Sequence, residues 1–133
     1  MKYLLDTNIC IYLIKQRPAP VLDHLQRCKP GDIGLSAITV SELEYGVCKS
    51  ARPQENRLAL AEFLAPLEVL MFDDHAAAKY GKIRAELERQ GRPIGAMDLL
   101  IAAHALSRHL ALVTNNEREF LRIPDLKVVN WVD

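Results

Sequence analysis

The chain has 133 residues, the size of one ordinary domain, and 50% of them are hydrophobic while 26% are charged. This balance is that of a globular protein and excludes a disordered or fibrous one. The 17 basic and 17 acidic residues cancel, which argues against a domain that coats nucleic acid, because such domains carry a basic excess. The neutral total does not exclude a local basic surface. Several basic side chains could form one, or could simply lie on solvated faces: Lys15, Arg17, Lys49, Arg52, Arg84, Arg89 and Arg92.

Apolar periodicity and turn residues divide the chain into short strands that alternate with helices. In chain order we predict strand 3–5, helices 9–15 and 20–27, strand 33–35, helices 39–49 and 54–64, strand 68–72, helices 76–89 and 97–107, and strands 110–113 and 128–131. Alternation of this kind implies parallel pairing with right-handed crossovers. The sequence therefore predicts an α/β sandwich with a central, mostly parallel sheet, formed by a single domain over residues 1–133.

Other common classes find no support in the sequence. The three cysteines are odd in number and contain no CxxC pair, so we expect neither a disulfide framework nor a zinc site. No stretch approaches the roughly 20 apolar residues of a membrane helix, and Asp6 interrupts the apolar start. We expect a cytoplasmic protein without membrane contact.

Acidic and polar residues lie at one kind of place in the predicted elements. Asp6 follows strand 3–5, and Thr114 follows strand 110–113; Asp98 and Glu42 lie in or near the first turn of their helices. In a parallel α/β sheet the carboxyl ends of strands and the amino ends of helices share one edge, which is where such folds bind ligands. We therefore expect these four residues to converge in space.

Each acid also has an ordinary structural explanation. Asp6 could cap the following helix, Thr39-x-x-Glu42 matches a capping box, and Asp98 could be favoured by the helix dipole alone. Against these readings, Asp6 and Asp98 stand among apolar neighbours, where a carboxylate is costly without a cation or hydrogen-bond donors. Several carboxylates at one edge would also repel one another.

A hard divalent cation would resolve both costs. Oxygen ligands without Cys or His favour Mg²⁺, for which Mn²⁺ could substitute, over zinc. Mg²⁺ held by carboxylates can activate a water and stabilise charge at a phosphorus centre. The chain contains no GxSxG motif, catalytic-cysteine signature or GxxxxGK[ST] loop. This chemistry therefore needs no nucleophilic side chain.

At these residues the chain resembles PIN-domain proteins, and more narrowly the VapC toxins of type II toxin–antitoxin pairs. The resemblance runs through the whole chain and rests on four segments in the right order: Leu4-Leu5-Asp6-Thr7-Asn8, Ser41-Glu42-Leu43-Glu44-Tyr45-Gly46, Asp98-Leu99-Leu100-Ile101-Ala102-Ala103-His104-Ala105, and Val113-Thr114-Asn115-Asn116 with Phe120.

This resemblance implies a PIN-like three-layer α/β/α fold and a Mg²⁺-dependent endoribonuclease. It assigns Asp6, Glu42 and Asp98 as catalytic acids, with Asp6 and Asp98 the principal metal ligands. It also implies structured RNA as substrate, including transfer RNA near the anticodon, and hence inhibition of translation. The implied partners are a VapB-type antitoxin that blocks the site and a second copy of the chain within a larger complex.

The last motif departs from the family pattern. Many PIN domains carry an aspartate at the position of Asn116, and we hypothesise that Glu119 supplies the fourth acidic group instead, if a helical turn begins here. Thr7 and Thr114 are expected to orient the acids through hydrogen bonds. Asn8 could do the same or cap a helix.

Two other readings remain open at this stage. A phosphatase that uses its first aspartate as nucleophile would need a second acid two residues later, where Asn8 stands. A non-catalytic RNA-binding or partner-binding module would not require the acids, and the neutral net charge counts against free RNA binding.

Overall fold

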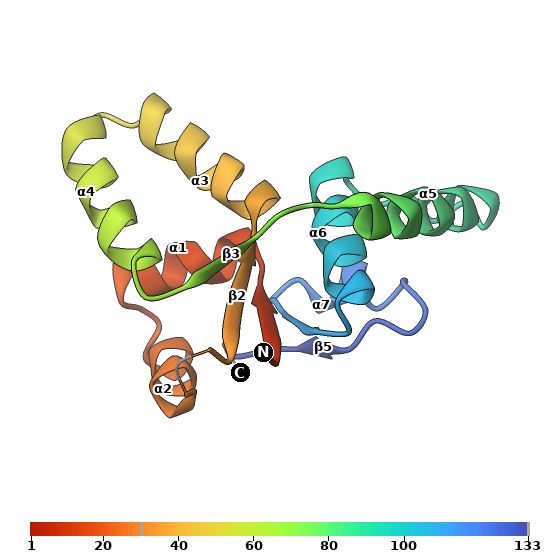
Figure 1. Cartoon of the computed structure of the whole chain (residues 1–133), viewed down its shortest axis with the longest axis horizontal. Helices are drawn as coiled ribbons and strands as arrows, with labels where there is room; N and C mark the ends of the chain where they lie inside the picture. Colours follow the sequence, from red (N-terminus) through yellow and green to blue (C-terminus); the bar gives the residue numbers. More distant parts are fainter. Residues whose placement is uncertain (30, 133) are drawn as a thin grey trace.

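The computed structural model describes residues 1–29 and 31–132 and contains a five-stranded sheet in the order β3-β2-β1-β4-β5 (Figure 1). Each of the four strand pairs in this order is parallel. The strands are β1 (Tyr3–Leu5), β2 (Ile33–Ser36), β3 (Glu68–Leu70), β4 (Ala111–Val113) and β5 (Val128–Val129). The predicted parallel sheet is confirmed.

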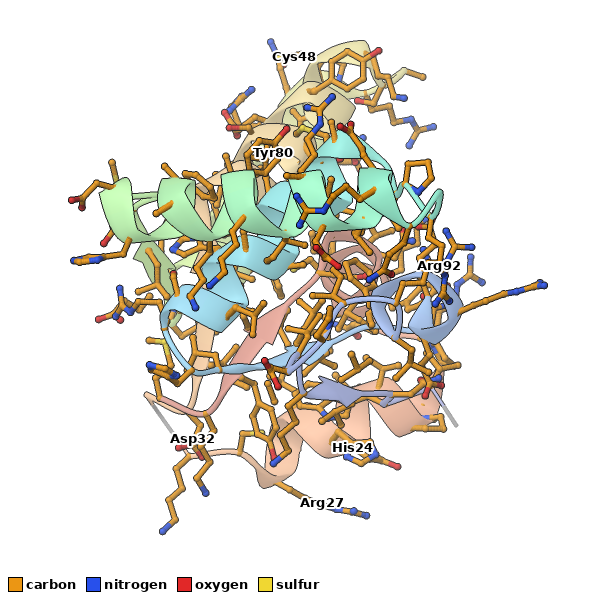
Figure 2. All side chains as sticks on the ribbon, turned by 90° about the vertical axis from the view of Figure 1, so that its right-hand side faces the viewer. His24, Arg27, Asp32, Cys48, Tyr80 and Arg92 are labelled. Atoms are coloured by element: carbon orange, nitrogen blue, oxygen red, sulfur yellow. The ribbon has the colours of Figure 1, made fainter. Side chains whose placement is uncertain are left out.

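Helices cover both faces of the sheet and complete the three-layer architecture (Figure 1). They are α1 (Thr7–Lys15), α2 (Ala19–Arg27), α3 (Ala37–Lys49), α4 (Pro53–Leu64), α5 (Asp74–Arg89), α6 (Ala96–Ser107) and α7 (Glu117–Phe120). On one face α5 lies across the outside of α6 (Figure 2). Within residues 1–29 and 31–132, no helix is long and apolar enough to cross a membrane.

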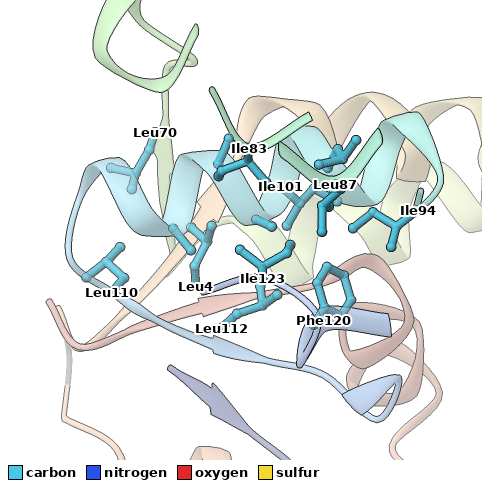
Figure 3. Packing of buried hydrophobic residues seen from close by; sticks show 14 residues of the cluster. Leu4, Leu70, Ile83, Leu87, Ile94, Ile101, Leu110, Leu112, Phe120 and Ile123 are labelled. Atoms are coloured by element: carbon cyan, nitrogen blue, oxygen red, sulfur yellow. The ribbon is translucent and has the colours of Figure 1, made fainter. Parts of the chain in front are cut away.

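Two apolar cores form because successive strand side chains point to opposite faces of the sheet. Leu4 and Leu112 join the core beneath α5 and α6 (Figure 3), whereas Leu5 and Val113 join the core beneath α1 to α4. All four side chains are fully buried. The continuous apolar runs in β1 and β4 are therefore explained by helices packing on both sides.

Local signals at the start of α3 differ from the prediction. The helix begins at Ala37 instead of Thr39, and Ser36 is its N-cap residue, whose hydroxyl accepts a hydrogen bond from the Ile38 amide at 3.1 Å. The capping box between Thr39 and Glu42 is therefore wrong: Thr39 lies within the helix, and the Glu42 carboxylate is free of that role. At the chain's end, β5 stops at Val129 instead of residue 131.

The sheet order places the candidate site. From β1 the chain passes to β2 on one side, while β4 pairs with β1 on the other side. The strand order therefore changes direction between β1 and β4, and a change of this kind opens a crevice beyond the carboxyl ends of these two strands. Leu5 and Val113 are paired at those ends, so Asp6 and Thr114 follow side by side.

The central strands should dominate stability. Leu112 is fully buried, so Leu112→Ala should lower the free energy of unfolding by about 2–5 kcal/mol through lost burial and a cavity. Urea unfolding followed by circular dichroism measures this change. Leu58 is 68% exposed, and Leu58→Ala is the matched control, with a change within about 0.5 kcal/mol. Equal losses for the two variants would contradict the assigned core.

Candidate active site

Asp6 lies between β1 and α1 and uses both carboxylate oxygens. One oxygen accepts a hydrogen bond from the Ile9 amide at 3.0 Å and caps α1, and the other accepts from the Thr114 hydroxyl at 2.5 Å. Burial is the largest influence on this carboxyl group and raises its pKa, while these hydrogen bonds oppose the rise and nearby Glu42 adds to it. The capping explanation is thus correct and does not exclude a functional one.

A chain of hydrogen bonds continues from Thr114 to Glu119. The Thr114 hydroxyl accepts from the Asn116 amide at 2.9 Å, and the Asn116 side-chain amide donates to the Glu119 carboxylate at 2.9 Å. The predicted turn exists as α7, which contains Glu119. Asn116 therefore contributes no charge of its own but holds the Glu119 carboxylate at the fourth acidic position of the site, which we call the fourth corner.

Glu42 approaches the same edge from α3. Its carboxylate accepts a hydrogen bond from the Thr7 hydroxyl at 2.5 Å. Thr7 is the first residue of α1 and directly follows Asp6. The contacts made by Asp6 and by Thr7 therefore come from adjacent residues of the chain. Two threonine hydroxyls, Thr7 and Thr114, thus each hold one of the acids.

Asp98 lies in the first turn of α6 and has the most perturbed carboxyl group of the site. Its pKa is raised to about 7. Burial is the largest cause, followed by a hydrogen bond to Glu119 and repulsion from it, and then by repulsion from Asp6 and Glu42. The electrostatics therefore identify four acids that sense one another at this edge of the sheet.

This donor set fits a hard divalent cation. All four acids offer oxygen, which Mg²⁺ and Mn²⁺ prefer, and the raised pKa of Asp98 reflects its burial first and then the nearby negative charge of the other acids. Asp6 and Glu42 each place an oxygen on a threonine hydroxyl. In the described part of the chain, no three His, Cys, Asp or Glu side chains are gathered closely enough to form a metal-binding group.

Two other polar residues lie near the site: Asn8, for which the sequence predicts a role, and Asn115, for which it predicts none. Asn8 exposes its side chain, while its backbone amide lowers the pKa of Asp6. The bond from Asn115 to the Tyr12 hydroxyl, 2.9 Å long, was not predicted, because no spacing in the sequence relates residues 103 positions apart.

Comparison with protein families and relatives gives a consistent result. The PIN domain family matches residues 3–126. The chain is 46% identical over 131 residues to the tRNA(fMet)-specific endonuclease VapC of Shigella flexneri, covering 98% of each chain. It is 47% identical over 132 residues to the ribonuclease VapC2 of Haemophilus influenzae, covering 99% of each.

Solved structures agree with these matches over the same length. VapBC2 from Rickettsia felis, bound to a DNA fragment from their promoter, superposes with a TM-score of 0.93 at 42% identity, covering 98% of this chain and 99% of that one. DNA-bound VapBC from Salmonella typhimurium gives a TM-score of 0.93 at 44% identity, covering 98% of each chain.

The crowding at Asp98 predicts a pH-dependent stability in metal-free protein. Its pKa of about 7, against an ordinary 3.8, means that the folded state binds this proton more tightly than the unfolded state. This contribution is complete below pH 4 and is lost as pH rises through 7. We expect Asp98→Asn, which cannot ionise, to lose less stability than the wild type between pH 5 and 8.

Urea unfolding in EDTA across this range measures the effect. Asp74, exposed at the start of α5, provides the control: Asp74→Asn should keep the wild-type slope. Identical slopes for wild type and Asp98→Asn would contradict the perturbed carboxyl group.

Proposed function

The chain belongs to the PIN-domain family and, within it, to the VapC proteins, and we propose that it is a Mg²⁺-dependent endoribonuclease, the toxin of a toxin–antitoxin pair. The single observation that carries this proposal is the placement of the acids at one edge of the sheet, where hydrogen bonds to Thr114, Thr7 and Asn116 hold Asp6, Glu42 and Glu119 and where Asp98 lies in the first turn of α6. Relatives named as ribonucleases support it.

We assign Asp6 and Asp98 as the principal metal ligands and Glu42 as the third catalytic acid. Bound Mg²⁺ would supply an activated water and would stabilise charge on the phosphate during hydrolysis of the phosphodiester bond. The Thr114 hydroxyl and the Ile9 amide hold the Asp6 carboxylate in one orientation. The Thr7 hydroxyl does the same for Glu42, so the acids are positioned before substrate binds.

At the fourth corner, Glu119 takes the place of the aspartate that many PIN domains carry at the position of Asn116. The amide of Asn116 directs the Glu119 carboxylate, and Asp98 keeps its proton up to about neutral pH, with burial and then Glu119 the leading causes of its raised pKa. Cation binding would displace this proton, because it removes the repulsion that raises the pKa of Asp98.

The proposed substrate is structured cellular RNA, including transfer RNA cut near the anticodon, with inhibition of translation as the outcome. Two relatives named as tRNA(fMet)-specific endonucleases, at 46% and 44% identity, support this choice. Single-stranded loops suit such an enzyme because their unstacked bases and backbone are accessible. The enzyme would act in the cytoplasm, where its substrate is found.

The proposed partner is a VapB-type antitoxin that covers the site, and the toxin itself would pair with a second copy. The similar solved structures are VapBC complexes, which supports the first partner. A groove of about 270 Å³ between α1, α3 and α4 begins beside Glu42 and is otherwise mostly apolar, with Ile11, Ile14 and Leu60 among its lining residues.

A direct test is cleavage of total RNA by the purified protein. We expect cleavage with Mg²⁺ and none with EDTA. Asp6→Asn and Asp98→Asn should each lower the rate by about 100-fold or more, because each removes a charge that acts on the reacting phosphate through the metal. Rates come from denaturing gels, and sequencing of the new RNA ends locates the cleaved bonds.

Asp74→Asn controls for loss of an acid elsewhere and should cleave like the wild type. Because Asp6 also caps α1, circular dichroism must show that each variant is folded. Undiminished cleavage by both site variants would instead indicate a contaminating nuclease, and binding of RNA without any cleavage would favour a non-catalytic module.

Glu119→Gln tests the fourth corner separately. The variant should need about tenfold more Mg²⁺ for half-maximal cleavage, because loss of a group that supports a metal site lowers metal affinity by about 10-fold to 100-fold. Titration of the cleavage rate with Mg²⁺ measures this. Glu117→Gln, on the same short helix, is the matched control. Normal activity and normal Mg²⁺ dependence in Glu119→Gln would exclude a role for Glu119.

A further inference from the structure

Beyond the acids, a buried polar contact joins α6, which carries Asp98, to Ser36, the last residue of β2 and the N-cap of the helix that carries Glu42. Among the described residues, two hydrogen bonds between side chains lie wholly in the interior: Thr114 to Asp6, within the site, and Ser36 with His104, outside it. The Ser36 hydroxyl and His104 Nδ1 are 2.7 Å apart, and their residues are 0% and 1% exposed. The proposed reaction does not use this second contact.

The position of the contact relates it to the acids. Ser36, at the end of β2, precedes Glu42 of α3 by six residues, and His104 follows Asp98 by six residues on α6. Both helices also touch through Ile38, which packs against the core beneath α6. Ser36 is held in the sheet by the pairing of β2 with β3, so the Ser36–His104 contact is a directional constraint on α6 relative to the start of α3, which apolar packing alone does not supply.

The serine hydroxyl makes two contacts. It accepts from the Ile38 amide at 3.1 Å as the N-cap of α3, and it can donate its own proton to His104 Nδ1. The same oxygen thus determines where α3 begins and where α6 lies. A shift of the imidazole would disturb the first turn of the helix that carries Glu42.

The surroundings of the imidazole favour its neutral form. Burial is the main cause that lowers the pKa of His104, and Arg108 lowers it further, while Asp73 and the Met71 backbone oppose this. Phe72 packs edge-on against the ring at 5.4 Å. In the described part of the chain Nε2 is buried without a hydrogen-bond partner, and Nδ1 faces the Ser36 hydroxyl.

A buried histidine often has only a packing role. Here one ring nitrogen and the Ser36 hydroxyl pair with one another in the interior, and burying polar atoms is costly unless they are paired. The pair lies where the start of α3 faces α6. We propose that His104 is a positioning residue, which through Ser36 sets the placement of Glu42 relative to Asp98 and thereby the affinity of the site for its divalent cation.

This inference rests on the proposed function and is tested by His104→Leu against His104→Asn. Leucine removes the acceptor, whereas asparagine places a polar atom near the position of Nδ1 that can pair with Ser36. For His104→Leu, below its melting temperature, we expect kcat to fall about tenfold with KM nearly unchanged, because small misplacements of catalytic groups are costly. Mg²⁺ affinity should also fall about tenfold. His104→Asn should recover most of both.

Mg²⁺ affinity is read from the rise in melting temperature that added Mg²⁺ produces, which does not require cleavage. If the wild type binds Mg²⁺ without cleaving RNA, the proposed function fails while the role of His104 is still measured. Val21, fully buried in α2, provides the control for lost stability: Val21→Ala should lower the melting temperature and leave kcat and Mg²⁺ affinity unchanged.

Wild-type kcat and Mg²⁺ affinity in His104→Leu would overturn the proposal, as would equal changes in Val21→Ala or no recovery in His104→Asn. If His104→Leu does not fold, Ser36→Thr and Ser36→Ala replace the pair, because threonine keeps the hydroxyl and alanine removes it. Recovery confined to Ser36→Thr would support the proposal, and equal behaviour of the two would overturn it.

Discussion

The Asp6 carboxylate is the constraint on which the rest of the site depends. It joins the end of β1, the first turn of α1 and the residue that follows β4, through hydrogen bonds to the Ile9 amide and the Thr114 hydroxyl. A buried carboxylate is tolerated only when donors of this kind satisfy it. The same bonds that make it structurally acceptable also fix the direction in which it faces the other acids.

Around this carboxylate the fold assembles more negative charge than it neutralises. Asp98 responds by holding its proton up to about neutral pH, because burial and three other acids oppose its ionisation. Such repulsion is an electrostatic cost, and the two apolar cores on either face of the sheet offset it. Under the proposed function, a bound cation would relieve this cost.

The acids reach the edge from three different parts of the fold. Asp6 follows the central strand β1, whereas Glu42 comes from α3 and Asp98 from α6. Their relative placement therefore depends on contacts between elements, among them the directional Ser36–His104 pair. The likeness to PIN-domain structures at a TM-score of 0.93 shows that this arrangement of layers is shared with VapC relatives.

The sequence by itself determined the parallel α/β architecture and its main elements, because hydrophobic periodicity is a local property. It also identified Asp6, Glu42 and Asp98, since strand ends and helix starts share one edge. Only the tertiary structure decided that Ser36 caps α3, that Asn116 directs Glu119, and that Ser36 contacts His104, 68 residues away. These bonds depend on which side chains meet across layers, and no spacing along the chain encodes that.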